Sequence, residues 1–308
     1  MAKNCLLVSA GWLLTAKEDL ACYEDWGFLI EDGIVSDMGP RKDLTAKYST
    51  SDELALNDHI VCPGLINCHN HAAMKLMRGL GQGLNLDDWL RQAIWPFEKE
   101  HLDAPTVGLG AELAMVEMLM SGITTFSDMY FFPETVASVA ERLGLNIQLA
   151  VPIISLDTRW ARGSEECIHR ALALHDLYRD HQHVSVSFGP HSVEALDIET
   201  LEKIGMYADE LDIGIQIHLQ ETSGELDRAL KNHGHSFVVL LKKIGLMNER
   251  LQVVHAVHLT SEDKAILAET NANVIHCPSS NLLLGSGISP TKDLLELGVN
   301  VALGTDGS

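Results

Sequence analysis

Histidines and acidic residues recur at the ends of short apolar runs in this chain of 308 residues. The first such group is His69-Asn70-His71, in which two imidazoles stand two residues apart. On a strand this spacing turns both side chains to one face, so both can share one cation. Alone, the pair is weak support for a metal site, because core and solvent-facing histidines can have the same spacing.

Three further groups have the same character. His218 ends an alternating apolar run, and Glu221 follows it by three residues. Glu221 therefore reaches the same site only if the chain has curved into a loop; otherwise it is a carboxylate in solvent. Of His255 and His258, we expect His255 to face the site, since it directly follows two valines. The fourth group is Asp306, in a Gly-Thr-Asp-Gly stretch that by itself would be an ordinary turn.

Together these residues form the ligand set of a metal-dependent hydrolase. Imidazole nitrogens and a carboxylate are accepted by zinc and by ferrous iron, and a catalytic site keeps one position open for water. A bound divalent cation lowers the pKa of that water toward neutrality. A neighbouring carboxylate such as Glu221 can then move protons between the water, a ring nitrogen and a leaving amine.

The elements that must position these groups alternate between strand and helix. Amphipathic segments separate the apolar runs, several of them closed by glycine, which favours parallel pairing of the strands. Eight strands with polar residues at their carboxyl ends predict a (β/α)8 barrel, whose active sites lie at that end. No Gly-rich nucleotide fingerprint follows the first strand, which argues against a dinucleotide-binding sheet. The eight runs are 65–71, 123–130, 147–154, 184–192, 213–221, 251–259, 272–280 and 300–308.

Residues 1–60 have a different pattern, with short apolar and β-branched runs broken by turn residues such as Gly39-Pro40. We therefore expect two domains, a small β domain over residues 1–60 and the barrel over residues 61–308.

Composition excludes several classes of protein. The net charge of −21 argues against a nucleic-acid partner, since phosphate binding needs clustered lysine and arginine. No apolar run is long enough to cross a membrane, and the N-terminus lacks the pattern of a signal peptide. The six cysteines are scattered, without a CxxC pair, which fits reduced thiols and a cytoplasmic location.

The motifs in this order resemble the amidohydrolase superfamily over essentially the whole chain. The resemblance is strongest to the branch of 5′-methylthioadenosine/S-adenosylhomocysteine deaminases and the related triazine chlorohydrolase-like enzymes. It rests on stretches such as PGLINCHNHAAMKLMRG (63–79), WPFE (95–98), GITTFSDMYF (122–131), HLQETSGE (218–225), HCPSSNLLLGSGISP (276–290) and LGTDGS (303–308).

This resemblance implies a TIM-type barrel with a small β-sandwich domain at the N-terminus, and it implies roles for single residues. His69, His71, His218 and Asp306 would bind one divalent metal ion, zinc before iron. The catalytic residues would be Glu221 as proton shuttle, His255 as the group that orients the attacking oxygen, and Asp306, which would also take a proton from the attacking water. Glu98 matches a ribose-binding glutamate and His191 a substrate-contacting histidine. His276 and Asn281 lie near the site by motif and receive no chemical role.

The implied reaction is hydrolytic deamination of an adenine nucleoside to an inosine-type product and ammonia. The substrate would be 5′-methylthioadenosine, S-adenosylhomocysteine or both. Members that hold the homocysteine carboxylate often have an arginine near the end of strand three, where this chain has AVPIISLD (150–157). Arg159 or Arg162 in the following loop could replace it, but methylthioadenosine, which has no carboxylate, is the safer expectation.

The resemblance also implies an eighth helix and closing strands of the small domain after Asp306, so we expect a 308-residue product to be truncated, and unstable or inactive. Two alternatives to the nucleoside reaction stay open. One is another reaction of the same superfamily, such as triazine dechlorination or deamination of guanine, cytosine or a pterin. The other is a non-catalytic barrel scaffold, which the full set of ligands disfavours. Homo-oligomers fit such barrels, but the sequence does not fix a subunit number.

Overall fold

The computed structural model describes residues 5–16, 21–48 and 52–307, and the chain divides into two compact units, residues 1–64 and 65–308. The first unit is a four-stranded sheet in the order β3-β2-β1-β4, in which only β1 and β4 run parallel. One helix, α1, contributes Leu44 to a small core with Leu7 and Leu29. The described residues form this single sheet, without the second sheet that a β-sandwich requires. The elements are β1 (Cys5–Leu14), β2 (Cys22–Glu31), β3 (Ile34–Pro40), α1 (Arg41–Lys47) and β4 (Asp52–Val61).

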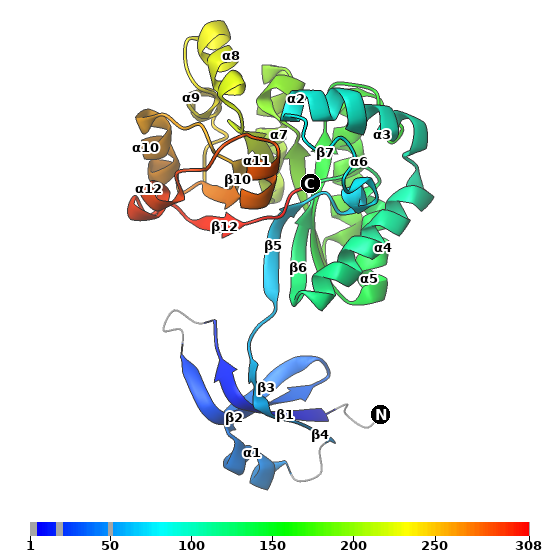
Figure 1. Ribbon diagram of the computed structural model, residues 1–308, viewed down its shortest axis with the longest axis vertical. Helices are drawn as coiled ribbons and strands as arrows, with labels where there is room; N and C mark the ends of the chain where they lie inside the picture. Colours follow the sequence, from blue (N-terminus) through cyan, green and yellow to red (C-terminus); the bar gives the residue numbers. More distant parts are fainter. Residues whose placement is uncertain (1–4, 17–20, 49–51, 308) are drawn as a thin grey trace. The chain divides into compact units, whose positions relative to one another are not determined.

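The second unit is an eight-stranded parallel barrel, which confirms the predicted fold class (Figure 1). The strands follow one another in chain order, each beside its predecessor, as βα units joined by crossover helices require. Their interior and helix-facing side chains are mostly buried, so the strands are near-continuous apolar runs. They are β5 (Leu65–Asn70), β6 (Ile123–Asp128), β7 (Asn146–Ile153), β8 (Val184–Pro190), β9 (Ile215–Leu219), β10 (Leu251–His255), β11 (Asn273–His276) and β12 (Val301–Leu303).

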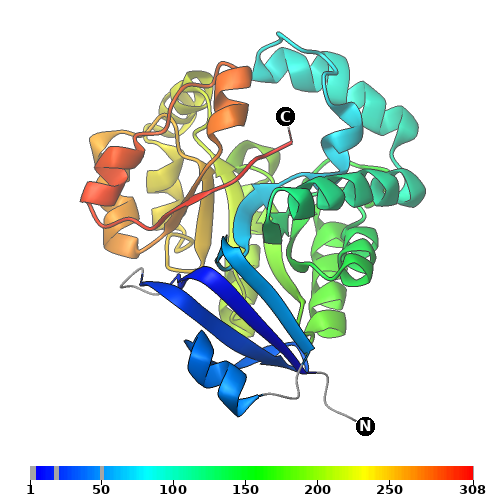
Figure 2. The same ribbon diagram turned by 60° about the horizontal axis from the view of Figure 1, so that its bottom comes forward.

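Residues just after β12 close the barrel against β5, where the red and blue segments meet in Figure 2. The amides of Thr305 and Asp306 both donate to the carbonyl of His69, at 3.0 and 3.1 Å. The side chain of Asn67 adds two hydrogen bonds to Thr305. Gly304 permits this approach, because a Cβ there would lie 2.9 Å from the backbone oxygen of His69. The closure brings Asp306 beside the first strand.

Helices surround the strands, and their ends carry the local signals that the sequence contains (Figure 1). Asp103 and Asp197 cap helix N-termini, Thr260 forms a capping box with Asp263, and Gly144 ends α5 in the left-handed conformation. The longer helices are α4 (Ala104–Met120), α5 (Pro133–Leu143), α6 (Gly163–Tyr178), α7 (Ile198–Leu211), α8 (Ser223–His233) and α10 (Ser261–Thr270). The shorter ones are α2 (Leu86–Trp89), α3 (Trp95–His101), α9 (Phe237–Lys243), α11 (Pro278–Leu283) and α12 (Thr291–Glu296), with 3₁₀ helices at Ala72–Met77 and Val193–Ala195 and a π-helical turn at Leu90–Ile94.

One continuous hydrophobic core fills the barrel and the layer beneath its helices. Phe126, Phe188 and Ile153 are among its largest fully buried side chains. Such a core holds the strand ends rigidly, which is what a precisely placed site needs. Among the described residues, no helix is long and apolar enough to cross a membrane.

Candidate metal and proton-transfer site

Four side chains predicted as metal ligands converge at the carboxyl ends of the barrel strands. They are His69 on β5, His71 directly after it, His218 on β9 and Asp306 after β12. One ligand atom from each lies within 4.8 Å of the others. His69 is fully buried, and the side chains of His71 and Asp306 are 12 % exposed. The barrel therefore brings together groups that are up to 237 residues apart in the chain.

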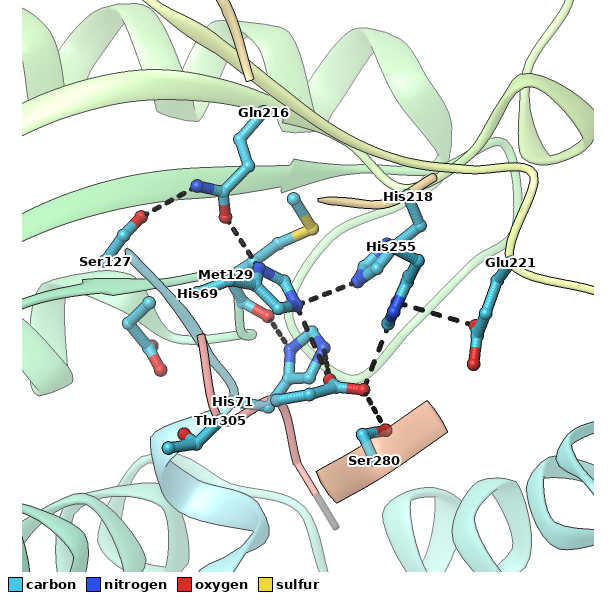
Figure 3. A network of polar contacts seen from close by, with 12 residues as sticks. His69, His71, Ser127, Met129, Gln216, His218, Glu221, His255, Ser280 and Thr305 are labelled. Carbon is cyan, nitrogen blue, oxygen red and sulfur yellow. Dashed lines mark hydrogen bonds and ion pairs between the residues drawn. The ribbon is translucent and has the colours of Figure 1, made fainter. Parts of the chain in front are cut away.

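Each of the three imidazoles is oriented by a hydrogen bond from its Nδ1 atom. His69 Nδ1 lies 2.8 Å from Oε1 of Gln216, as Figure 3 shows. His71 Nδ1 bonds the carbonyl of Met129, and His218 Nδ1 lies 2.7 Å from the carbonyl of His191. Because these partners are acceptors, each Nδ1 carries the proton. The Nε2 atoms of all three rings face the common centre, and those of the neutral His69 and His218 rings carry lone pairs. Burial opposes ionisation of His71, but its hydrogen bond to Asp306 raises the pKa of the His71 ring above its ordinary value.

The arrangement of these lone pairs fits a metal cation. Nε2 of His218 lies 3.1 Å from Nε2 of His69, a distance at which two lone pairs repel unless a positive charge lies between them. Nε2 of His71 lies 3.1 Å from Oδ1 of Asp306. Three imidazole nitrogens and one carboxylate oxygen are a donor set that zinc accepts, and the Nδ1 contacts are the usual outer partners of such ligands.

The electrostatics of the cluster point the same way. Burial raises the pKa of Asp306, but the imidazoles of His69 and His71 hold it well below its usual range. Burial also lowers the pKa of His69 and holds that of His218 well below its ordinary value. Asp306 thus stays ionised and the two rings stay neutral, as metal ligands must be.

Glu221 and His255 lie on the other side of the cluster. His255 ends β10, and its Nε2 lies 3.5 Å from Oε2 of Glu221 and 4.0 Å from Oδ2 of Asp306. Both side chains are buried, with exposed fractions of 9 % and 1 % for Glu221 and His255. Burial, followed by the charge of Asp306, raises the pKa of Glu221 to about 7, while burial lowers that of His255 to about 4. Near neutral pH, Glu221 can gain or lose a proton and His255 stays neutral.

Three of the strand ends that carry these groups turn through left-handed backbone conformations. The φ angles are +50° at Gln220, +74° at His255, +48° at Ala256 and +59° at Asp306. None of these residues is glycine, so each position costs of order 1–3 kcal/mol that the surroundings must offset. The amides of Ala256 and of the two residues after it offset part of this cost by bonding the carbonyls of Leu219 and Gln220. The turn at Gln220 is the curve that Glu221 needs to reach the site.

Residues without a predicted chemical role support this side of the site, among them Asn281, which the motifs placed nearby. Asn281 and Ser286, both buried, contact Glu221, and Asn281 also contacts His255. Ser280 donates to Oδ2 of Asp306 at 2.6 Å. Ser280 and Asn281 belong to α11, and Figure 3 shows Ser280 entering the site from that helix. The polar run from Ser279 to Asn281, directly after a strand end, is the signal that could have revealed them.

Glu98, on α3, is held by a tyrosine that had no predicted role. The hydroxyl of Tyr130 donates to Oε1 of Glu98 at 2.6 Å, and the Tyr130 ring lies 6.1 Å from that of His71. Burial raises the pKa of Glu98, and the hydrogen bond from Tyr130 opposes the rise. Tyr130 thus ties Glu98 to the metal-ligand side of the barrel, leaving Oε2 for another partner.

The three remaining histidines of the motifs differ in how close they lie to the metal-ligand cluster. The His191 ring lies 4.8 Å from that of His218, with its side chain accessible from solvent, so it borders the site. His258 does not reach the cluster: its Nε2 bonds the carbonyl of Ser286 at 2.7 Å. His276 ends β11, and its Nδ1 is buried without a hydrogen-bond partner among the described residues.

Comparison with known proteins adds an independent finding. The model of the Amidohydrolase family matches residues 60–308. The chain belongs to the amidohydrolase family. This membership confirms the resemblance inferred from the motifs, and with it the class of hydrolases acting on carbon–nitrogen bonds.

The family relatives are similar over nearly the whole chain. A 5-methylthioadenosine/S-adenosylhomocysteine deaminase of Teredinibacter turnerae is 41 % identical over 98 % of this chain and 68 % of its own length. The enzyme of the same name from Saccharophagus degradans is 40 % identical over the same shares. This chain therefore spans about two thirds of the length of these relatives.

Solved structures show the same fold. An adenosine deaminase from Xanthomonas campestris with bound zinc has a TM-score of 0.95 and 34 % identity, covering 98 % of this chain and 69 % of that one. The zinc complex of an atrazine chlorohydrolase from Arthrobacter aurescens has a TM-score of 0.90 at 23 % identity, covering 98 % and 72 %. At that identity, the second likeness concerns the fold alone.

Proposed function

We propose that this protein hydrolytically deaminates the adenine ring of a nucleoside, with 5′-methylthioadenosine as its preferred substrate. The observation that carries the proposal is the pairing of a four-ligand cation cluster with a buried glutamate, Glu221, whose pKa is raised to about 7. The names of the deaminase relatives, which give 5-methylthioadenosine and S-adenosylhomocysteine together, support the class of substrate.

The reaction adds water to the ring C=N bond at the carbon that bears the amino group and then expels ammonia. One C–O bond forms at the carbon that bears the amino group, and its C–N bond breaks. A divalent cation held by His69, His71, His218 and Asp306, which we propose to be a single zinc ion, would supply a water of lowered pKa. Glu221 takes a proton from the attacking water, gives it to the ring nitrogen and then assists protonation of the leaving amine.

His255 and Asp306 complete the proton-handling side. His255 is neutral and donates a hydrogen bond toward the attacking oxygen, which orients it. Asp306 stays ionised and can accept a second proton from the same water. Both roles are supported by the position of His255, whose Nε2 atom lies 3.5 Å from Oε2 of Glu221 and 4.0 Å from Oδ2 of Asp306.

The nucleoside part of the proposal rests on Glu98 and His191. A carboxylate can accept from two adjacent hydroxyls, so Glu98 would bind the ribose, and His191 would contact the substrate beside the metal ligands. Arg159 is exposed and donates to carbonyls of α3, those of Lys99 and Glu100. The end of β7 and the residues after it, AVPIISLD (150–157), contain no arginine, which favours a substrate without a carboxylate over S-adenosylhomocysteine.

The wider setting is proposed on sequence grounds. The scattered cysteines fit a cytoplasmic enzyme, the charge of −21 disfavours nucleic-acid partners, and a homo-oligomer fits a barrel of this kind. We also propose that the small β domain covers residues 1–60 and the barrel residues 61–308.

A substrate screen tests the proposal. Zinc-loaded protein would be assayed for ammonia release from methylthioadenosine, S-adenosylhomocysteine, adenosine and guanine, and for chloride release from a chlorotriazine. We expect methylthioadenosine to have the highest kcat/KM and the Glu221→Gln variant to turn it over with a kcat about 10²- to 10⁴-fold lower. Turnover of the free base or the triazine alone would overturn the nucleoside assignment.

A further inference from the structure

His255 differs from the three ligand histidines in what its Nδ1 atom contacts. The Nδ1 atoms of His69, His71 and His218 each face an oxygen acceptor. Nδ1 of His255 instead lies 3.0 Å from the amide nitrogen of Asn281, Nδ2. An amide nitrogen only donates, so the His255 Nδ1 atom must accept. The proton of this neutral ring then resides on Nε2, which faces Glu221 and Asp306.

The orientation of the Asn281 amide is fixed by Glu221. Nδ2 of Asn281 also lies 3.5 Å from Oε1 of Glu221, an oxygen that already accepts from the Ser286 hydroxyl at 2.7 Å. In this orientation Oδ1 of Asn281 has no hydrogen-bond partner among the described residues. Turning the amide over would set Oδ1 against Oε1 of Glu221, a contact between two acceptors when Glu221 is ionised, and would leave His255 Nδ1 without its donor. Asn281 is fully buried, so no solvent contact would compensate for this exchange.

The backbone of Asn281 also supports the loop that carries Ser286, the second partner of Glu221. Its carbonyl accepts from the amide of Ser286 at 2.8 Å, which keeps the Ser286 hydroxyl on Glu221. His258 bonds the carbonyl of Ser286 at 2.7 Å, so the loop after α11 is anchored to the segment after β10. One residue therefore contacts both proton-handling groups and the loop that supports them.

We propose that Asn281 is a positioning residue that fixes His255 in the Nε2–H tautomer and holds Glu221 beside it. The consequence is that His255 is a hydrogen-bond donor toward the site and offers no lone pair there, whereas the three ligand histidines offer lone pairs and no proton. Asn281 thereby excludes His255 from the ligand set and makes it a neutral donor. This inference rests on the proposed function only for its effect on the rate.

Nuclear magnetic resonance of zinc-loaded protein labelled with ¹⁵N-histidine tests the tautomer directly. Two-bond ¹H–¹⁵N correlations separate protonated from unprotonated ring nitrogens, and a His255→Gln variant identifies the His255 signals. We expect His255 to be protonated at Nε2 alone and His69, His71 and His218 at Nδ1 alone. A His255 ring protonated at Nδ1 in the unsubstituted protein would overturn the proposal.

The Asn281→Asp variant tests the cause. A carboxylate in place of the amide attracts the proton to His255 Nδ1, so we expect the opposite tautomer, unchanged zinc content and a kcat reduced about 10- to 100-fold. Asn300→Asp is the matched control, because Asn300 is exposed at the opposite end of the barrel and contacts Asn273. If Asn281→Asp keeps the original tautomer, Asn281 does not set it.

The two readouts separate this proposal from the proposed function. The tautomer is measured without substrate, so its assignment stands or falls whether or not a nucleoside is deaminated. Should Asn281→Asp fail to fold, the spectrum of the unsubstituted protein still decides the tautomer. Absence of deamination combined with the expected tautomers would refute the substrate and leave the positioning role intact.

Discussion

The site has a metal side, formed by His69, His71, His218 and Asp306, and a proton-transfer side, formed by Glu221 and His255. The two sides are held in place by different kinds of contact. On the metal side, two of the three imidazoles bond main-chain carbonyls, those of Met129 and His191, which follow strands β6 and β8. On the proton-transfer side, Glu221 and His255 depend on the side chains of Asn281 and Ser286, from α11 and the loop after it. The barrel backbone itself thus orients two of the three imidazoles, whereas the groups proposed to handle protons depend on a few replaceable side chains.

Removal of a metal ligand should have the largest effect, because it should reduce both zinc binding and activity. We expect His218→Ala to weaken zinc binding by more than the 10- to 100-fold typical of an outer partner, and to abolish ammonia release, because only two imidazole donors remain. Zinc content after dialysis and activity at saturating substrate measure this. His183→Ala is the control, since His183 is exposed at the start of β8 and bonds Asn146. Retention of zinc by His218→Ala would refute its place in the ligand set.

Substituting the proton carrier should leave the metal side intact. We expect Glu221→Gln to retain one zinc ion per chain while kcat falls about 10²- to 10⁴-fold, since an amide cannot transfer the proton. Glu296→Gln, at an exposed position on α12 paired with Lys292, should change nothing. Loss of zinc together with activity in Glu221→Gln would show that Glu221 is also needed for metal binding, which contradicts the proposed division of the site.

Gln216 is the side chain that orients the His69 imidazole. It bonds His69 through Oε1 and donates from Nε2 to the carbonyl of Cys68, to Ser127 and to Gln252. We expect Gln216→Met to weaken zinc binding about 10- to 100-fold, as measured by competition with a chelator. Gln216→Glu keeps an acceptor for His69 and should restore most of the affinity. Equal losses in both variants would show that packing alone matters.

The smallest effect concerns the substrate side. Tyr130→Phe removes one hydrogen bond from Glu98, and we expect KM for the nucleoside to rise about 2- to 10-fold with kcat little changed. Steady-state kinetics measures this, with Tyr207→Phe on α7 as the control. A lower kcat at constant KM would instead assign Tyr130 to the chemical step.

Much of this arrangement was predictable, because the barrel repeats one simple pattern. Apolar runs that end in His218, His255 and Asp306 mark strand ends, and parallel strands bring their carboxyl ends to one face. The structure places all eight strands within the predicted runs or one residue outside them. Strand length is short and burial two-sided, which makes such runs easy to recognise.

The supporting residues were less predictable for a physical reason. Gln216 and Tyr130 have no motif spacing of their own, and the motif around Asn281 gave its place but no role. Each acts through a partner elsewhere in the chain, as between Gln216 and His69, 147 residues apart. In the sequence, an asparagine or glutamine in a strand or helix cannot be distinguished from any other polar residue, because its role depends on a partner that only the fold brings near. The roles of Glu98 and His191 came from resemblance and remain predictions.

The most direct test of the account is anomalous X-ray diffraction at the zinc absorption edge from crystals of zinc-loaded protein. We expect one strong peak, coordinated by Nε2 of His69, His71 and His218 and by a carboxylate oxygen of Asp306, with His255 and Glu221 beside it and outside the coordination sphere. A peak elsewhere, or one coordinated by His255, would contradict the division of the site into a metal side and a proton-transfer side.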